Sequence, residues 1–251
     1  MESIQIKILI ILVSAHFLGD FVFQTDNDVK RKRSWLIFLK HIFFIASLTY
    51  LILGVFNSYV IILIVVISHI IIDLIKLKIK KDNIWIFIVD QSLHLLILLL
   101  ISLNYKKFLT EGDEIYWEEI FGNNFYMILI LITSIIVLTK VSGILISYLI
   151  KPLQINVTTN ENKNEKTLPQ TGKIIGYLER IIIYISVLSN VPALIGFLIT
   201  AKSILRYSEI KNENDKLFVE YILIGTLFSF SLGISFSYLS QKVIEILRVN
   251  L

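Results

Sequence analysis

The chain has 251 residues, of which 55% are hydrophobic and 18% charged, and its mean hydropathy is +0.75. Soluble globular domains carry about a quarter charged residues, so the composition excludes an ordinary soluble protein and indicates a polytopic membrane protein. The net charge of +4 does not indicate nucleic-acid binding, because the basic residues gather at the ends of apolar runs. The absence of cysteine excludes disulfides and thiolate metal ligands.

The apolar runs predict an all-α bundle of about eight membrane-spanning helices, because a backbone that faces lipid must satisfy its hydrogen bonds internally. A run of about 20 residues is long enough to cross the hydrocarbon core. The expected spans are 5–24, 35–54, 58–79, 84–103, 124–150, 174–189, 191–206 and 217–241. The sixth and seventh are short and joined through "SNVP", so they fit either two crossings or a re-entrant hairpin, which makes the count seven or eight.

Four parts are expected along the chain. A four-helix membrane module covers 1–104, and an external loop with the fifth span covers 105–154. A polar linker at 155–172 then separates these parts from a C-terminal membrane module at 173–251.

The basic residues predict the orientation. Sixteen of the 24 lysine and arginine residues lie in the loops of one side, including "KRKR" at 30–33 and "KLKIKK" at 76–81. The positive-inside rule places that side in the cytoplasm and both termini outside.

Ionisable residues repeat at a fixed interval in the first four expected spans. An interval of 53 residues separates His16 from His69, His41 from His94 and Asp20 from Asp73. The segments 5–54 and 58–103 therefore resemble a duplicated two-helix unit, with copies that point the same way. Asp90 has no equivalent in the first copy, because Ile37 occupies that position.

The same residues are expected at one depth of the membrane. Spans one and three carry His-x-x-x-Asp, and span four, which runs the opposite way, carries the reversed order from Asp90 to His94. Residues four apart share a helix face. The four histidines and three aspartates are therefore expected to meet in one layer near the cytoplasmic side.

A charged side chain inside a membrane costs roughly 2.5–3.5 kcal/mol, so such a layer must pair internally, face water or bind a cation. Imidazole and carboxylate groups are ligands for zinc, manganese or iron. We therefore interpret the four histidines, His16, His41, His69 and His94, as metal ligands. The aspartates, Asp20, Asp73 and Asp90, are interpreted as further ligands, as groups that orient the imidazoles, or as a general base. A proton or ion pathway and a purely structural polar network are the alternatives.

The C-terminal part carries a second group of charged residues. Arg180, Lys202 and Arg206 could form a basic pocket for a phosphate-bearing head group or a lipid-linked substrate. Glu179 and Glu220 are interpreted as structural ion-pair partners. The alternative is that the three basic residues snorkel and anchor their helices at the interface, while the two glutamates neutralise nearby basic residues.

Five segments carry a family resemblance: "AHFLGDFVFQT", "DQSLHLL", "GKIIGYLER", "AKSILRYSE" and "EYILIGTLFS". With them the chain resembles the uncharacterised bacterial membrane proteins grouped as domain of unknown function 3307. The resemblance implies the bacterial cytoplasmic membrane and no established activity. The layout is also similar, more loosely, to small bacterial inner-membrane proteins described as metal-dependent hydrolases.

The leading hypothesis is a metal-dependent hydrolase that acts on a lipid or lipid-linked phosphate, with membrane lipid and an anionic lipid-linked substrate as partners. The rival is a transporter or channel for a divalent cation or protons. A non-catalytic membrane scaffold is the third reading. The sequence leaves the substrate, the metal and the oligomeric state open.

Overall fold

The computed structural model describes residues 3–57, 59–79, 83–109, 114–157, 169–207 and 213–249. These residues form helices and short connections, without a strand among them, so the predicted all-α class is confirmed. Among the described residues, six helical segments are long and apolar enough to cross a membrane: Ser3–Phe23, Trp35–Leu53, Val60–Lys78, Ile84–Leu103, Asn124–Pro152 and Glu220–Val249. The expected count of eight is not confirmed. The sixth expected span corresponds to the helix Pro169–Leu188, which is not among the six, and the seventh corresponds to a shorter apolar helix, Ala193–Ile204.

The chain divides into two compact units. The first comprises 1–136 and 243–251, and the second comprises 137–242. This division falls inside long helices, whereas most of the linker expected at 155–172 lies outside the described residues.

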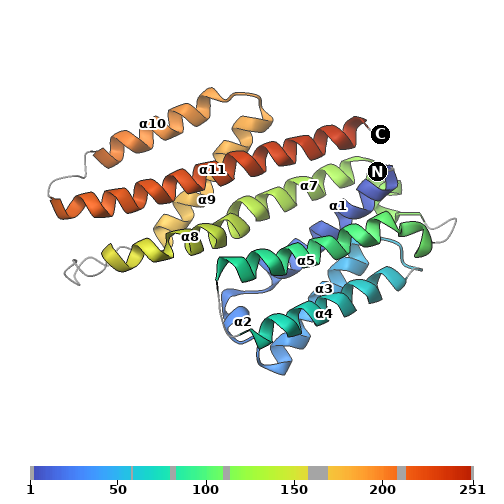
Figure 1. The fold of residues 1–251 in the computed structure, drawn as a ribbon. Helices are drawn as coiled ribbons and strands as arrows, with labels where there is room; N and C mark the ends of the chain where they lie inside the picture. The colour runs from blue at the N-terminus through green and yellow to red at the C-terminus, as the bar shows by residue number, and fades with distance from the viewer. Residues whose placement is uncertain are drawn as a thin grey trace. The chain divides into compact units, whose positions relative to one another are not determined.

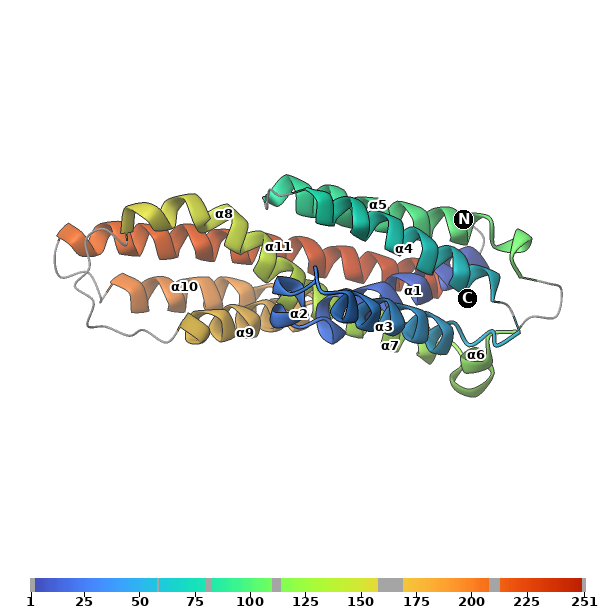
Figure 2. The same cartoon turned by 90° about the horizontal axis from the view of Figure 1, so that it is seen from below.

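The first unit is built around a ring of four helices (Figures 1 and 2). Its members are α1 (Ser3–Leu18, continued by the π-helix η1, Gly19–Phe23), α3 (Trp35–Leu53), α4 (Val60–Lys78) and α5 (Ile84–Leu103). Helix α1 packs against α3 and α5, and α4 packs against the same two helices. The 53-residue repeat relates α1 to α4 and α3 to α5. Each helix pair in contact therefore has a repeat-related pair that is also in contact.

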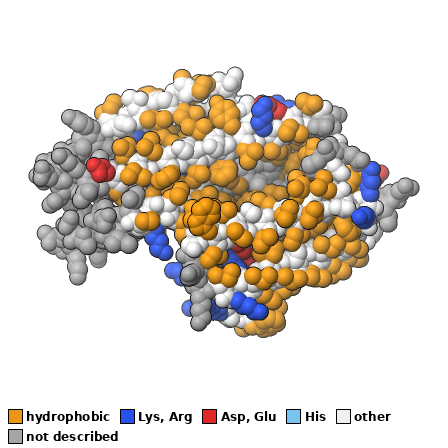
Figure 3. Space-filling view, viewed as in Figure 1, with side chains coloured by type: hydrophobic (Ala, Val, Ile, Leu, Met, Phe, Trp, Pro, Cys, Tyr) orange, Lys and Arg blue, Asp and Glu red, His pale blue; other side chains and the backbone are white. Residues whose placement is uncertain are grey.

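Helix α4 has an exposed apolar face and a buried polar face. Leu63, Ile67 and Ile71 recur every fourth residue and are each more than half exposed, whereas His69 and Asp73 on the opposite face are buried. Polar groups inside and apolar groups outside are the pattern expected for a helix in a bilayer. Hydrophobic side chains also cover much of the face seen in Figure 3.

The ring has an apolar half and a polar half. The apolar half lies where α1 and α4 begin and α3 and α5 end. Its buried side chains include Ile8, Ile11, Leu12, Ile45, Ile61, Val65 and Leu98. Helix α7 (Asn124–Ile136) packs against α1, and Ile244 and Leu247 near the end of the chain join the same core. The polar half lies at the opposite end of the ring.

Helix α6 (Tyr116–Phe121) closes the apolar end. Gly54 ends α3 with φ +65°, and the ring of Trp117 lies so close that a Cβ at Gly54 would be 2.7 Å from it. Trp117 donates its indole N–H to the carbonyl of Leu51, while Glu118 receives hydrogen bonds from Lys7 and Tyr126. These contacts fix the loop to the ring.

The second unit contains the π-helix η3 (Val137–Val141) and the helices α8 (Ser142–Val157), α9 (Pro169–Leu188), α10 (Ala193–Tyr207) and most of α11 (Glu213–Val249). Helices α9 and α10 pack as a hairpin, with Asn190 in the left-handed region (φ 55°) at its turn. A small core of Ile183, Val187, Ile195 and Phe230 joins α9, α10 and α11.

Candidate metal centre

Two histidines face each other in the polar half of the ring. His41 lies on the second turn of α3 and His69 on the third turn of α4, and their Nε2 atoms are 2.9 Å apart. The side chains of both are 2% exposed. One Nε2 must therefore carry a lone pair toward the other, because two N–H groups cannot point at each other at this distance.

Asp20 reaches this pair from the π-helix η1. Its Oδ1 lies 3.6 Å from Nε2 of His41 and 3.5 Å from Nε2 of His69. Gly19 permits this approach, because a Cβ there would lie 2.3 Å from Cδ1 of Ile45 on α3. A single π-turn inside an α-helix is frequent at functional sites. Asp20 Oδ1 is also buried without a hydrogen-bond partner among the described residues.

Asp73 completes the group from α4. Its Oδ2 lies 3.4 Å from Nε2 of His41 and 3.6 Å from Nε2 of His69. Lys32, from the turn before α3, places its Nζ 2.7 Å from the same oxygen. The lysine is 9% exposed, so it brings a buried positive charge to the site.

The spacing of these ligand atoms suits a metal ion. Tetrahedral ligands with metal bonds of about 2.1 Å are about 3.4 Å apart. The four separations between an imidazole Nε2 and a carboxylate oxygen are 3.4–3.6 Å, and the two Nε2 atoms are closer, at 2.9 Å. His41, His69 and Asp73 form one group that could hold a metal ion. A metal-binding histidine commonly donates a hydrogen bond from the N–H of its other ring nitrogen. In His41 that nitrogen, Nδ1, has no hydrogen-bond partner among the described residues.

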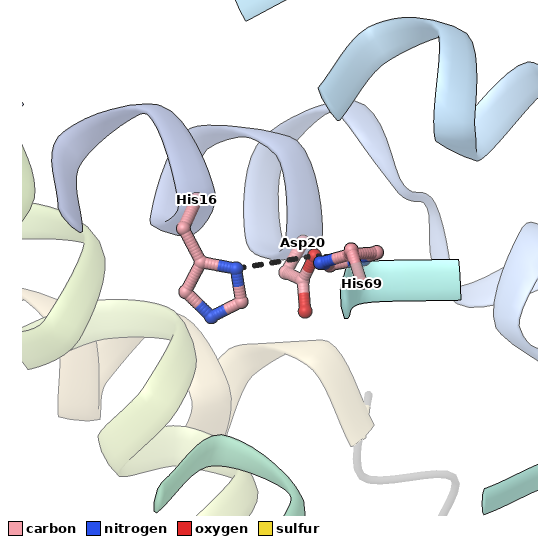
Figure 4. A group of neighbouring side chains, drawn as sticks. All are labelled: His16, Asp20 and His69. Atoms are coloured by element: carbon pink, nitrogen blue, oxygen red, sulfur yellow. Dashed lines mark ion pairs between the residues drawn. The ribbon is translucent and has the colours of Figure 1, made fainter. Parts of the chain in front are cut away.

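His16 forms a second such group with Asp20 and His69. Figure 4 shows the Asp20 carboxylate between the two imidazoles. Nδ1 of His16 lies 3.8 Å from Asp20 Oδ1, while its Nε2 lies 3.3 Å from the side-chain oxygen of Gln91. His16 therefore stands beside the carboxylate, farther away than His41 and His69.

His94 has a fixed tautomer. Its Nδ1 lies 2.9 Å from the backbone carbonyl of Asp90, which can only accept, so Nδ1 carries the proton. Nε2 then carries the lone pair, and it is buried without a partner among the described residues. The ring centroid of His94 is 4.4 Å from that of His69 and 4.9 Å from that of His16. His94 thus places a ring nitrogen without a partner among the described residues next to the other imidazoles.

Asp90 belongs to the edge of the site. Its Oδ2 accepts hydrogen bonds from Lys76 at 2.6 Å and from Gln91 at 3.1 Å. Through Gln91 the aspartate is joined to His16. The polar groups therefore form a connected series from Lys76 to Lys32 within the polar half of the ring.

Sequence reasoning missed Lys32, Lys76 and Gln91. Lys32 and Lys76 were interpreted as topology signals in "KRKR" and "KLKIKK", although Lys76 lies three residues after Asp73, a spacing that places it near the same helix face. Gln91 is adjacent to Asp90 in the chain. Nothing in the sequence marks Lys32 among its three basic neighbours.

The charged residues expected in the C-terminal part lie in the second unit. Glu179 forms an ion pair with Lys202 at 2.7 Å. Arg180 is 3% exposed; its Nε donates to the carbonyl of Leu138 and its Nη1 to the hydroxyl of Ser229. Glu220 is exposed, and the side chain of Arg206 lies outside the described residues. The substrate-binding role expected for Arg180, Lys202 and Arg206 stays a prediction.

The contact made by Arg180 has a local cause. The π-helix η3 interrupts the α-helical hydrogen bonding of the long helix that α7 begins, and Arg180 donates to one of its carbonyls. A Cβ at Gly233 would lie 3.2 Å from Cγ of Arg180, so the glycine leaves room for the arginine beside α11.

The part of the chain that holds the candidate centre matches a known protein family. Residues 8–121 match the family described as protein of unknown function (DUF3307). The resemblance inferred from the motifs is therefore shown for that part, which contains all seven histidines and aspartates of the expected layer. No curated protein and no solved structure matches the chain.

The fold and the site together show a membrane-embedded helical protein with His/Asp groups that could bind a metal ion. Two imidazoles, two carboxylates, a buried lysine and a third imidazole, that of His94, lie at one end of a helical ring. Such a set can hold a divalent cation, bind an anionic group and accept a proton.

Proposed function

We propose that the first unit binds a divalent metal ion through His41, His69, Asp20 and Asp73 and hydrolyses a phosphate ester of a membrane lipid or lipid-linked molecule. The observation that carries the proposal is the convergence of two Nε2 atoms and two carboxylate oxygens at 2.9–3.6 Å in a buried place. Zinc, manganese and iron all suit this nitrogen and oxygen set.

The charges support a bound cation. Two carboxylates that share a buried site repel each other, and Lys32 is 2.7 Å from only one of them. A divalent ion would neutralise both and would leave Lys32 with the net charge suited to a phosphate oxygen.

A metal ion in this place would supply Lewis acidity. The residues of the chain would do the rest. Lys32 would bind the phosphate, and Nε2 of His94 would take the proton of the attacking water, since this nitrogen is buried without a partner among the described residues and His94 is not one of the proposed ligands. The new bond joins the water oxygen to phosphorus, the bond from phosphorus to the lipid oxygen breaks, and that oxygen leaves as the alcohol with the proton that His94 took from the water.

The rival function, passage of a cation or protons, finds less support. A pathway would have to continue through the apolar half of the ring, where buried side chains such as Ile11, Ile61 and Leu98 fill the core. The linked polar groups instead begin and end, at Lys76 and Lys32, on the same end of the ring. Basic residues flank this end, which supports the cytoplasmic placement proposed from the sequence.

Elemental analysis of the protein purified in detergent tests the metal. We expect about one equivalent of metal in the wild type and none in His41→Ala/His69→Ala. His94→Ala should retain the metal, because His94 is not among the four proposed ligands. Hydrolysis of phospholipids and lipid-linked phosphates should then be lost in both variants. A wild type that binds no metal after supplementation contradicts the proposal and leaves the polar group as a structural network.

A further inference from the structure

A groove between α4 and α5 opens on the outside of the ring, next to the candidate centre. Its cavity measures about 240 Å³. Its walls are mainly apolar and include Ile72, Ile75, Val89 and Leu93. Three polar residues also line it: Lys76, Asn83 and Asp90.

The groove changes in polarity along its length. Asn83 caps the start of α5, and Trp85 beside it is 69% exposed. Lysine and tryptophan are enriched where a bilayer meets water, so this end of the groove is expected at the membrane interface. Leu93 lies seven residues farther along α5 than Ile86, or about 10 Å deeper at 1.5 Å per residue. The groove therefore runs from the interface into the hydrocarbon region.

Asp90 connects the groove to the candidate centre, because its Oδ2 accepts from Gln91, which in turn contacts His16. Asp90 is 5% exposed, and its Oδ1 is buried without a partner among the described residues. The side chain of Lys76, which pairs with the other oxygen of Asp90, is 38% exposed. An ammonium group has three N–H donors, so Lys76 can contact Asp90 and still bind an anion.

We propose that this groove binds one hydrocarbon chain of a phosphate-bearing lipid whose head group also carries a hydrogen-bond donor. The chain lies along Ile72, Val89 and Leu93. The phosphate accepts from Lys76, and a head-group hydroxyl donates to Oδ1 of Asp90. The inference rests on the proposed function, because it names the substrate class of the same site and the side from which that substrate enters.

Retention of lipid by the purified protein tests the groove. Wild type would be reconstituted with equal amounts of phosphatidylglycerol, which has both an anionic phosphate and hydroxyl donors, and phosphatidylcholine, which has no donor. Native mass spectrometry of the protein after extraction should show phosphatidylglycerol retained in about tenfold excess, which corresponds to about 1.4 kcal/mol.

Two matched variants test whether the lipid binds in the groove. Ile75→Trp fills the groove, and we expect this variant to lose the excess of phosphatidylglycerol over phosphatidylcholine. Ile67→Trp changes the same helix at a residue of nearly equal exposure, 54% against 55%, which does not line the groove, and it should keep the excess. Lys76→Arg, which preserves the charge, should also keep it.

Metal content measured on the same samples separates the two proposals. Equal retention of both lipids by the wild type contradicts the proposed lipid site even when metal is present. An excess of phosphatidylglycerol that persists in Ile75→Trp contradicts it as well. Selective retention in a protein that binds no metal supports the groove and overturns the proposed hydrolase.

Discussion

The rings of His41 and His69 have their centroids 5.0 Å apart, and those of their repeat equivalents His94 and His16 are 4.9 Å apart. The duplicated sequence thus produces two pairs of imidazoles with nearly the same separation. The carboxylates do not follow this symmetry, because Asp20 and Asp73 both lie within 3.6 Å of the His41–His69 pair. That pair is therefore where we place the metal.

His69 and its repeat equivalent His16 should differ in their effect on metal affinity. His69 lies 3.5 Å from Asp20 and 3.6 Å from Asp73, whereas His16 is 3.8 Å from Asp20 and bonds to Gln91. We expect His16→Ala to weaken zinc binding by about 10–100-fold, as for a residue that supports a ligand, and His69→Ala to abolish it. Competition with a chromogenic chelator measures both, and equal losses would contradict the assignment.

Lys32 should stabilise the metal-free protein. Lys32→Met leaves the carboxylate of Asp73 buried and unpaired, which typically costs about 3–5 kcal/mol. We expect a lower unfolding temperature without metal and tighter zinc binding, since the lysine no longer competes for Oδ2. Lys40→Met is the control, because Lys40 pairs with Asp28 at the surface and should change little. Weaker zinc binding in Lys32→Met would contradict this role.

Arg180 should stabilise the second unit. Arg180→Met removes two hydrogen bonds and leaves the carbonyl of Leu138 without its donor, for an expected loss of about 1–3 kcal/mol. Thermal unfolding in detergent, followed by circular dichroism, measures the loss, with the exposed Lys151→Met as control. An unchanged unfolding temperature would favour the alternative, in which Arg180 serves only to bind a substrate anion.

Acid should loosen α2 (Asp26–Lys30), the short helix that precedes Lys32. The N–H of Thr25 and then Lys40 hold the pKa of Asp28 below its usual value. A lowered pKa means that the stabilisation is complete above the ordinary value near 3.9 and is lost as the pH falls through the lower one. Hydrogen exchange should show protected α2 amides at neutral pH and less protection below about pH 4. In Asp28→Asn the protection should be low and independent of pH.

Much of the first unit could be predicted from the sequence. The expected span at 84–103 has the same bounds as α5, and that at 35–54 differs by one residue from α3, because a run of about 20 apolar residues has few alternatives to a spanning helix. The interval of 53 residues also indicated that His16 and His69 occupy equivalent positions. The predicted count of eight spans is not confirmed in the C-terminal part. The apolar segments there are short and carry charges, so hydropathy predicts spanning helices poorly.

The sequence by itself determined that the chain is an all-helical membrane protein and that its histidines and aspartates recur at matched positions, because hydropathy and spacing are properties of the chain. Only the tertiary structure decided which atoms meet. The π-turn at Gly19–Phe23 carries Asp20 to the His41–His69 pair, Lys32 alone of the four basic residues at 30–33 pairs with Asp73, and Asp90 pairs with Lys76 instead of joining the centre. Spacing fixes the face on which a side chain lies, whereas the packing of neighbouring helices and the turns between them fix its partners.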